Sequence, residues 1–163
     1  MKIILGVICL PLLAVLISSC PPPPARELTW GVLDLTTNTS RNVGAHSSLQ
    51  INAGDRYIVS FNVKDPGKIG HLAVWGDGSF TCNDSDNGEF PDKLPAGIPK
   101  KEASPGNVQS FVTTDEFKYI ELSCGRHSTP FREFTVTNGT LHIHGEETSL
   151  AGGTVTAALD LTR

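Results

Sequence analysis

The chain has 163 residues, with 13 basic and 17 acidic side chains and a formal net charge of −4. This length suits a single domain with one hydrophobic core. The mild acidity and the lack of a basic stripe in the sequence argue against nucleic acid as a partner. The chain has 16 glycines and 11 prolines but one methionine, a composition that favours strands and turns over helices.

The first residues have the organisation of an export signal. One positive side chain, Lys2, precedes an uncharged apolar run of 15 residues, 3–17. A helix that crosses a bilayer needs about 20 such residues, so this run matches the apolar region of a secretion signal instead.

The segment that ends this run, Leu16-Ile17-Ser18-Ser19-Cys20, resembles the cleavage site of bacterial lipoprotein signal peptides. The resemblance covers residues 1–20. It implies that residues 1–19 are removed, that Cys20 receives a diacylglyceryl thioether and that its new amino group is acylated. Because two or more acyl chains attach a protein stably to a bilayer, we expect the protein to be anchored to a membrane of the bacterial cell envelope, periplasmic or surface-facing. A plain secretion signal that is cut nearby is the alternative.

Residues 20–26 form the expected spacer between the lipid and the domain. Four prolines follow the cysteine, Pro21–Pro24, and such a run favours an extended, stiff conformation over a helix. The remaining residues, 27–163, are expected to form one domain.

Segments of this domain alternate between apolar and polar residues with a period of two, as half-buried strands do. The clearest are residues 57–63 and 154–161, and the other expected strands are 28–35, with a bulge at Gly31, 69–82 and 117–124. Turn signals separate these runs, and no run has the length and period of an amphipathic helix. The pattern predicts an all-β antiparallel sandwich or barrel.

Residues 49–82 also resemble the Ig-like sandwich modules of bacterial exported proteins. The resemblance lies in the turn Gly54-Asp55, the strand 57–63, the turn Asp65-Pro66-Gly67 and a strand that ends at Cys82. Trp75-Gly76-Asp77-Gly78-Ser79 is similar to a turn of PKD-type domains. These resemblances imply an Ig-like β-sandwich that serves adhesion or spacing rather than chemistry.

The sandwich is expected to contain one long loop and one disulfide. Residues 83–106 contain four prolines and no clear period, so they are expected to form a long irregular loop. Cys9 leaves with the signal and Cys20 carries lipid, which leaves Cys82 and Cys124 to form a disulfide in an oxidising compartment. A thiol pair for catalysis or metal binding is the alternative, but no C-x-x-C spacing supports it.

The dipeptide Asn138-Gly139, between two alternating runs, predicts a two-residue β-hairpin. In that register His142 and His144 share the polar face, and Glu133 lies opposite His144. Two imidazoles and a carboxylate can bind zinc or copper. The simpler interpretation is an exposed polar face without metal.

Three functions follow from these observations. The leading one is a membrane-anchored envelope lipoprotein that acts as a non-enzymatic binding or structural module for an envelope protein or glycan. The second is a metal-binding envelope protein that uses His142, His144 and Glu133. The third is a hydrolase of envelope polymers. It ranks last because the sequence has no G-x-S-x-G elbow or comparable catalytic motif.

Overall fold

The structure of the protein is a computed structural model that describes residues 27–64, 69–84, 88–90, 97–103, 112–113, 117–124, 131–150 and 152–163. These ranges are all-β, as predicted. None of them contains a helix long and apolar enough to span a membrane. The strands in chain order are β1 (Leu28–Asp34), β2 (Thr39–Gly44), β3 (His46–Gln50), β4 (Tyr57–Lys64), β5 (Ile69–Asp84), β6 (Gly88–Phe90), β7 (Gly97–Ala103), β8 (Val112–Thr113), β9 (Phe117–Glu121), β10 (Glu133–Ser149) and β11 (Thr154–Thr162).

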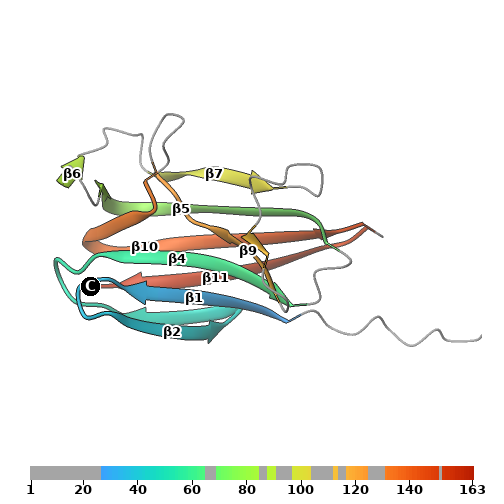
Figure 1. Ribbon diagram of the computed structural model, residues 1–163, viewed down its shortest axis with the longest axis horizontal. Coiled ribbons are helices and arrows are strands. Elements are labelled where there is room, and N and C mark those ends of the chain that lie inside the picture. The colour runs from blue at the N-terminus through green and yellow to red at the C-terminus, as the bar shows by residue number, and fades with distance from the viewer. Residues whose placement is uncertain are drawn as a thin grey trace, which may run out of the picture.

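The strands lie in two layers. The first layer has the order β2-β1-β4-β9-β8, and the second has the order β3-β11-β10-β5-β7, with β6 also paired to β5. The N-terminal part of β10 pairs with both β4 and β5, so the layers join into one curved sheet. Figure 1 shows the long strands of both layers running along the long axis of the molecule. Among the described strands, the pairs are antiparallel except for β3 with β11, which is parallel.

The hydrophobic core lies between the layers. Trp30 of β1 and Phe61 of β4 are fully buried, and their ring centroids lie 4.9 Å apart. Both rings pack against Gly145 of β10, where a Cβ would lie 2.9 Å from atoms of each ring. The missing side chain of Gly145 therefore leaves the space that these two rings fill between the layers.

The predicted alternation is confirmed in β4 and β11. Tyr57, Val59, Phe61 and Val63 of β4 are buried, while the residues between them are partly exposed. Ala157, Leu159 and Leu161 of β11 are also buried, although Val155, at the start of the strand, is exposed. Each large apolar side chain that leaves water in this way contributes about 1.5–3 kcal/mol to folding.

The hairpin predicted at Asn138-Gly139 is wrong. Residues 133–149 form one strand, β10, and both halves of this strand pair with β5. The register shifts at Asn138, where Gly139 has a φ of 63° and Gly78 in the partner strand has a φ of 136°. Glycines in these conformations let both strands bend together, so the chain continues through the dipeptide instead of turning back.

The segment 83–106, predicted to be irregular, contains two short strands. β6 and β7 both pair with β5, and Ile98 and Ala103 of β7 are buried against the core. Pro99 lies in β7 where its register with β5 shifts, between Val74 and Gly76. Because β7 pairs with no described strand other than β5, the proline lies on an edge strand, where its missing N–H removes no ladder hydrogen bond from a central strand.

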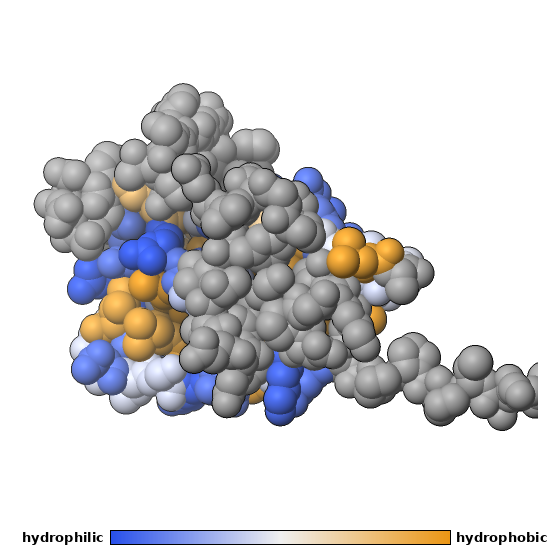
Figure 2. All heavy atoms as spheres, turned by 45° about the vertical axis from the view of Figure 1, so that its right-hand side comes forward, coloured by the Kyte–Doolittle hydropathy of each residue, from blue (hydrophilic) through white to orange (hydrophobic). Residues whose placement is uncertain are grey.

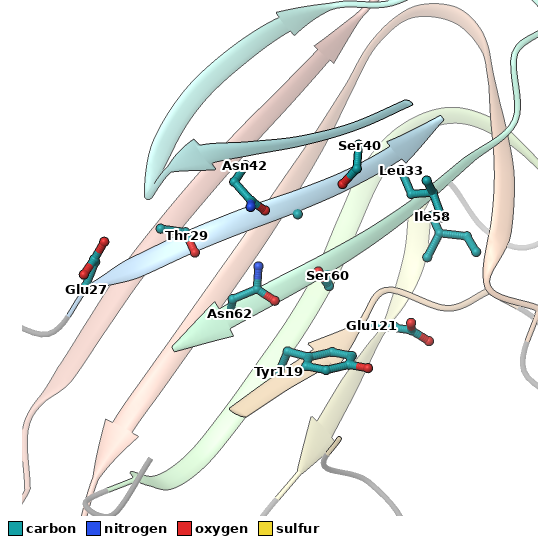
Figure 3. Close-up of a pocket in the computed structure, with 11 residues that line it drawn as sticks. Glu27, Thr29, Leu33, Ser40, Asn42, Ile58, Ser60, Asn62, Tyr119 and Glu121 are labelled. Carbon is teal, nitrogen blue, oxygen red and sulfur yellow. The ribbon is translucent and has the colours of Figure 1, made fainter. Parts of the chain in front are cut away.

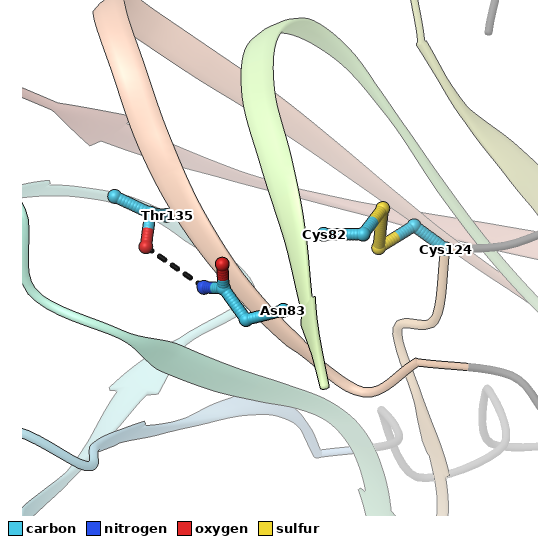
Figure 4. The surroundings of a disulfide bond; sticks show 4 residues. All are labelled: Cys82, Asn83, Cys124 and Thr135. Carbon is cyan, nitrogen blue, oxygen red and sulfur yellow. Dashed lines mark hydrogen bonds between the residues drawn. A yellow bond between two sulfur atoms is a disulfide. The ribbon is translucent and has the colours of Figure 1, made fainter. Parts of the chain in front are cut away.

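The predicted disulfide between Cys82 and Cys124 is confirmed (Figure 4). It joins the end of β5 to the segment that follows β9, across 42 residues of sequence. Backbone hydrogen bonds between Cys124 and Phe131 hold that segment from its other side, with N–O distances of 2.8 Å. Beside the disulfide, the buried Asn83 donates a hydrogen bond through Nδ2 to Oγ1 of Thr135 at 2.9 Å.

Candidate functional site

The outer face of the first layer holds a groove of about 480 Å³ (Figure 3). Strands β1, β2, β4 and β9 supply its walls and floor. Glu27, next to β1, lies at one end of the groove, and Leu33 and Ile58 lie near the other. The lining residues are Glu27, Thr29, Gly31, Leu33, Ser40, Asn42, Ile58, Ser60, Asn62, Tyr119 and Glu121.

The period of the strands places these residues on one face. Every second residue of a strand points to the same side of a sheet, so the alternation that buries Trp30 and Phe61 turns their neighbours outward. Across the strands, Gly31 pairs with Asn42 of β2 and with Ser60 of β4. These pairings bring polar side chains from neighbouring strands together around one glycine.

Gly31 forms the floor of the groove. The bulge predicted there is wrong, because β1 keeps a regular register with both neighbours through this residue. A Cβ at position 31 would lie 2.6 Å from Oγ of Ser60 and 3.3 Å from Nδ2 of Asn62. The glycine thus makes room between polar side chains, which is the other recognised use of glycine within a strand.

The polar side chains of the groove are uncommitted. Within the described ranges, no hydrogen bond engages the side chains of Thr29, Ser40, Asn42, Ser60 or Asn62. Hydroxyl and amide groups both donate and accept hydrogen bonds. The groove therefore presents a cluster of donors and acceptors that are free to bind a ligand.

The charged groups of the groove are already paired. Oε2 of Glu27 lies 3.0 Å from Nζ of Lys64, and Oε2 of Glu121 lies 3.0 Å from Nη1 of Arg132. Burial, together with the negative charge of Glu121, raises the pKa of the Tyr119 hydroxyl. The phenol is thus a neutral hydrogen-bond donor at the pH of a cell.

The histidines of the metal hypothesis lie on the second layer, away from this groove. Nδ1 of His142 lies 2.8 Å from Oδ1 of Asp160, and Nε2 of His144 lies 3.0 Å from Oδ2 of Asp77. The side chains of both histidines are partly exposed, by 49% and 37%. The ring of His144 also stacks on that of Trp75, at 5.4 Å between centroids.

Glu133 does not lie opposite His144, because β10 does not fold back on itself. It pairs across strands with Asn83, and its Oε2 lies 3.3 Å from Nη1 of Arg56. In the part of the chain that the structure describes, no group of three or more histidine, cysteine, aspartate or glutamate side chains is placed to hold a metal ion. Binding of zinc or copper by His142 and His144 alone stays a prediction.

Sequence reasoning missed the groove as a site. The polar residues of β4 were identified as an outward face, which is correct, but an outward face does not indicate which strands surround it. A glycine within a polar-faced strand, at position 31, was the one available signal. Cys20 and the spacer 20–26 lie outside the described residues.

No protein-family model matches the chain, and no curated protein matches it. Among solved structures, the chain shows similarity to a DUF4466 family protein from Parabacteroides merdae, with 12% sequence identity and a TM-score of 0.29. The match covers 83% of this chain and 44% of that protein, so the chain spans less than half of its length.

Proposed function

We propose that the protein is a lipid-anchored, non-enzymatic binding module of the bacterial cell envelope, and that the groove around Gly31 is its binding site. The lipoprotein-type segment that ends at Cys20 supports the location. The uncommitted hydroxyl and amide groups of the groove support the binding role.

The observation that carries this proposal is the open hydrogen-bonding capacity of the groove. Its volume of about 480 Å³ lies within the range of about 300–1,000 Å³ typical of small-ligand sites. Polar groups that face a concavity and have no protein partner form hydrogen bonds with water, and a ligand can replace that water. Such an arrangement suits recognition by several moderate hydrogen bonds.

Binding explains the lining better than catalysis does. Among the lining residues the ionisable side chains are Glu27, Tyr119 and Glu121, and both carboxylates are held in ion pairs. Within the described part of the chain, no histidine, cysteine or lysine lines the groove. Among the described residues, no lining hydroxyl is hydrogen-bonded to a carboxylate that would activate it as the nucleophile of covalent catalysis.

A sedimentation assay with isolated envelopes tests the proposal. The probe is the mature chain, residues 20–163, with Cys20→Ala so that it stays in solution. Filling the floor of the groove with Gly31→Val should raise the apparent dissociation constant for the envelopes, read from sedimentation at a series of envelope concentrations, by about tenfold, which corresponds to a loss of about 1.4 kcal/mol of binding free energy.

The matched control is Ser48→Val, which adds a similar apolar group to β3, an exposed strand of the second layer. This variant should sediment as the parent does. Equal sedimentation of the Gly31→Val variant and the parent would contradict a binding role for the groove. Turnover of envelope polymer by the parent would contradict the non-enzymatic assignment.

One observation favours metal binding as a second candidate function. His142 and His144 each have one ring nitrogen beside a carboxylate, of Asp160 and Asp77 respectively, and such carboxylates commonly orient the histidines that bind metals. Calorimetric titration with zinc or copper tests it. Binding that is no tighter than that of a His142→Ala, His144→Ala variant would remove this candidate.

A further inference from the structure

The charge of the groove restricts the chemistry of its ligand. Among the described residues, no lysine, arginine or histidine lines it, and its two carboxylates are paired with Lys64 and Arg132. An anionic ligand would have to compete with Glu27 and Glu121 for Lys64 and Arg132, and a strongly cationic ligand would compete with these two cations for the carboxylates. A ligand without net charge therefore fits best.

The backbone of the groove floor is fully used within the sheet. β1 pairs with β2 on one side and with β4 on the other, and β4 also pairs with β9. A peptide that binds by strand addition needs the free edge of a sheet, which this floor does not offer. Recognition in the groove must rely on side chains.

The side chains combine a polar centre with apolar borders. Asn42, Ser60 and Asn62 lie in the middle of the groove (Figure 3), and each has a polar atom within 3.6 Å of the place that a Cβ of Gly31 would take. The ring of Tyr119, from β9, borders this polar centre. An aromatic ring with a hydroxyl group offers an apolar face and a hydrogen-bond donor together. This pairing matches a pyranose ring, whose C–H groups form apolar faces and whose hydroxyls lie around its rim.

The length of the groove suits a short chain of such rings. Its lining residues on β1 include Thr29, Gly31 and Leu33, which span about 13 Å at about 3.3 Å per residue. Each neighbouring strand adds another row of side chains, about 4.8 Å from the row on the strand beside it. Repeated hydroxyls along a chain could thus meet repeated donors and acceptors along the sheet.

We infer that the groove binds a neutral oligosaccharide segment, with sugar hydroxyls hydrogen-bonded to Asn42, Ser60 and Asn62 and a ring face against Tyr119. This inference rests on the proposed function and adds the class of ligand to it. The ligand is a segment of a neutral polysaccharide or glycan, rather than a peptide or an acidic polymer.

A glycan array tests the inference with the mature chain carrying Cys20→Ala. The array presents neutral oligosaccharides of glucose, mannose, galactose and N-acetylglucosamine, together with sulfated and uronic-acid oligosaccharides and extended peptides. Neutral oligosaccharides should be bound, and calorimetry should then give their dissociation constants.

Two variants examine the contacts separately. Gly31→Val, which fills the floor, should weaken binding of the selected oligosaccharide by about tenfold or more. The double variant Asn42→Ala, Asn62→Ala should weaken it by at least about tenfold, because two hydrogen bonds of about 1 kcal/mol each are removed. Neither change touches the core, and thermal unfolding checks that both variants fold. Ser48→Val should bind as the parent does.

Several outcomes would overturn the inference. They are binding to acidic glycans or peptides in preference to neutral glycans, binding to none of the neutral glycans, and neutral-glycan binding that is unchanged in both groove variants. The proposed function fails separately. If Gly31→Val abolishes envelope sedimentation while no neutral glycan is bound, the ligand class is wrong and the groove remains a binding site.

Discussion

Two glycines of this protein, Gly145 and Gly31, leave room for neighbouring side chains on opposite sides of the sheet. Gly145 faces inward, and Trp30 and Phe61 fill the space that its Cβ would take. Gly31 faces outward, and the Ser60 hydroxyl and the Asn62 amide approach the space that its Cβ would take. Neither residue has the positive φ that often explains a glycine, so in both cases the surroundings decide its role.

Gly145→Ala should destabilise the fold by about 1–3 kcal/mol, because an added methyl group in a packed core forces neighbouring side chains out of place. The new Cβ would lie 2.9 Å from both aromatic rings. Urea unfolding measures the change. Gly44→Ala is the control, since the nearest atom to a Cβ there lies 4.0 Å away, and it should change stability by less than about 0.5 kcal/mol. Equal effects would contradict the packing account.

Buried Tyr57 should make the fold sensitive to alkali. Burial raises the pKa of its hydroxyl, to which Asp34 and Asp55 also contribute by their negative charges. Between the ordinary tyrosine pKa, 10.0, and the raised value, the folded state holds a proton that the unfolded state has lost. Stability therefore falls as the pH rises through this window.

The chain has two tyrosines, so the variant Tyr57→Phe isolates the buried one. Its urea midpoint should fall less steeply than that of the parent between pH 9 and about 11. At neutral pH the variant loses the hydrogen bond that the Tyr57 hydroxyl accepts from the Asn52 amide, of 3.3 Å, and the one that it donates to Oδ2 of Asp55, of 3.4 Å. It should therefore be less stable by about 1–2 kcal/mol. Parallel pH profiles for the two proteins would argue against this role of Tyr57.

Single residues of the groove could be predicted only in part. The alternation in 57–63 correctly turned Ser60 and Asn62 outward, because a period of two is a local property. Ser60 and Asn62 line a groove only because β1 and β9 lie on either side of β4. That arrangement joins segments about 30 and 60 residues apart in sequence, beyond what local patterns encode.

At the scale of elements, β10 shows how a correct local signal can give a wrong connection. Gly139 does have a positive φ, but Asn138 does not, whereas a two-residue Asn-Gly hairpin requires a positive φ at both. The partner strand β5 bends at the same level, at Gly78, and accepts both halves of β10. The bend is therefore shared by two long strands, and the sequence of one strand does not reveal the other.

The disulfide holds the end of β9, a strand whose side chains line the groove. Cys124 follows β9, the strand of Tyr119 and Glu121, and it is held to β5 through Cys82. A double variant with Cys82→Ala and Cys124→Ala should lose up to about 4 kcal/mol of stability, the chain-entropy value for a loop of this length. Urea unfolding of the oxidised parent and the variant measures the loss.

The same variant should bind the groove ligand more weakly even where it remains folded, because β9 would be less firmly held against β4. Reduction of the parent with dithiothreitol is the matching control and should reproduce both effects. Unchanged stability after reduction would show that the disulfide contributes little to the free energy of unfolding. Unchanged binding would show that the groove does not depend on the disulfide.

At the scale of the whole molecule, the start of the domain and one hydrophobic tip lie together. Figure 1 places the start of β1 and the connection between β10 and β11 at the same end of the molecule. Leu150 and Val155, in and after that connection, are the exposed large hydrophobic residues among those described, at 69% and 45%. Figure 2, which brings that end forward, shows a hydrophobic area on the right-hand side that adjoins hydrophilic residues.

The anchor predicted at Cys20 should dominate attachment to the membrane. Full burial of Leu150 and Val155 in lipid would contribute about 1.5–3 kcal/mol each, whereas each acyl chain contributes about 0.8 kcal/mol per buried methylene over its whole length. Cys20→Ala, expressed with its signal, should therefore leave the membrane pellet, while the variant Leu150→Ser, Val155→Ser should stay in it. Ultracentrifugation with labelled palmitate measures both. Labelling of the Cys20→Ala protein, or its retention in the pellet after a carbonate wash, would show that the attachment lies elsewhere.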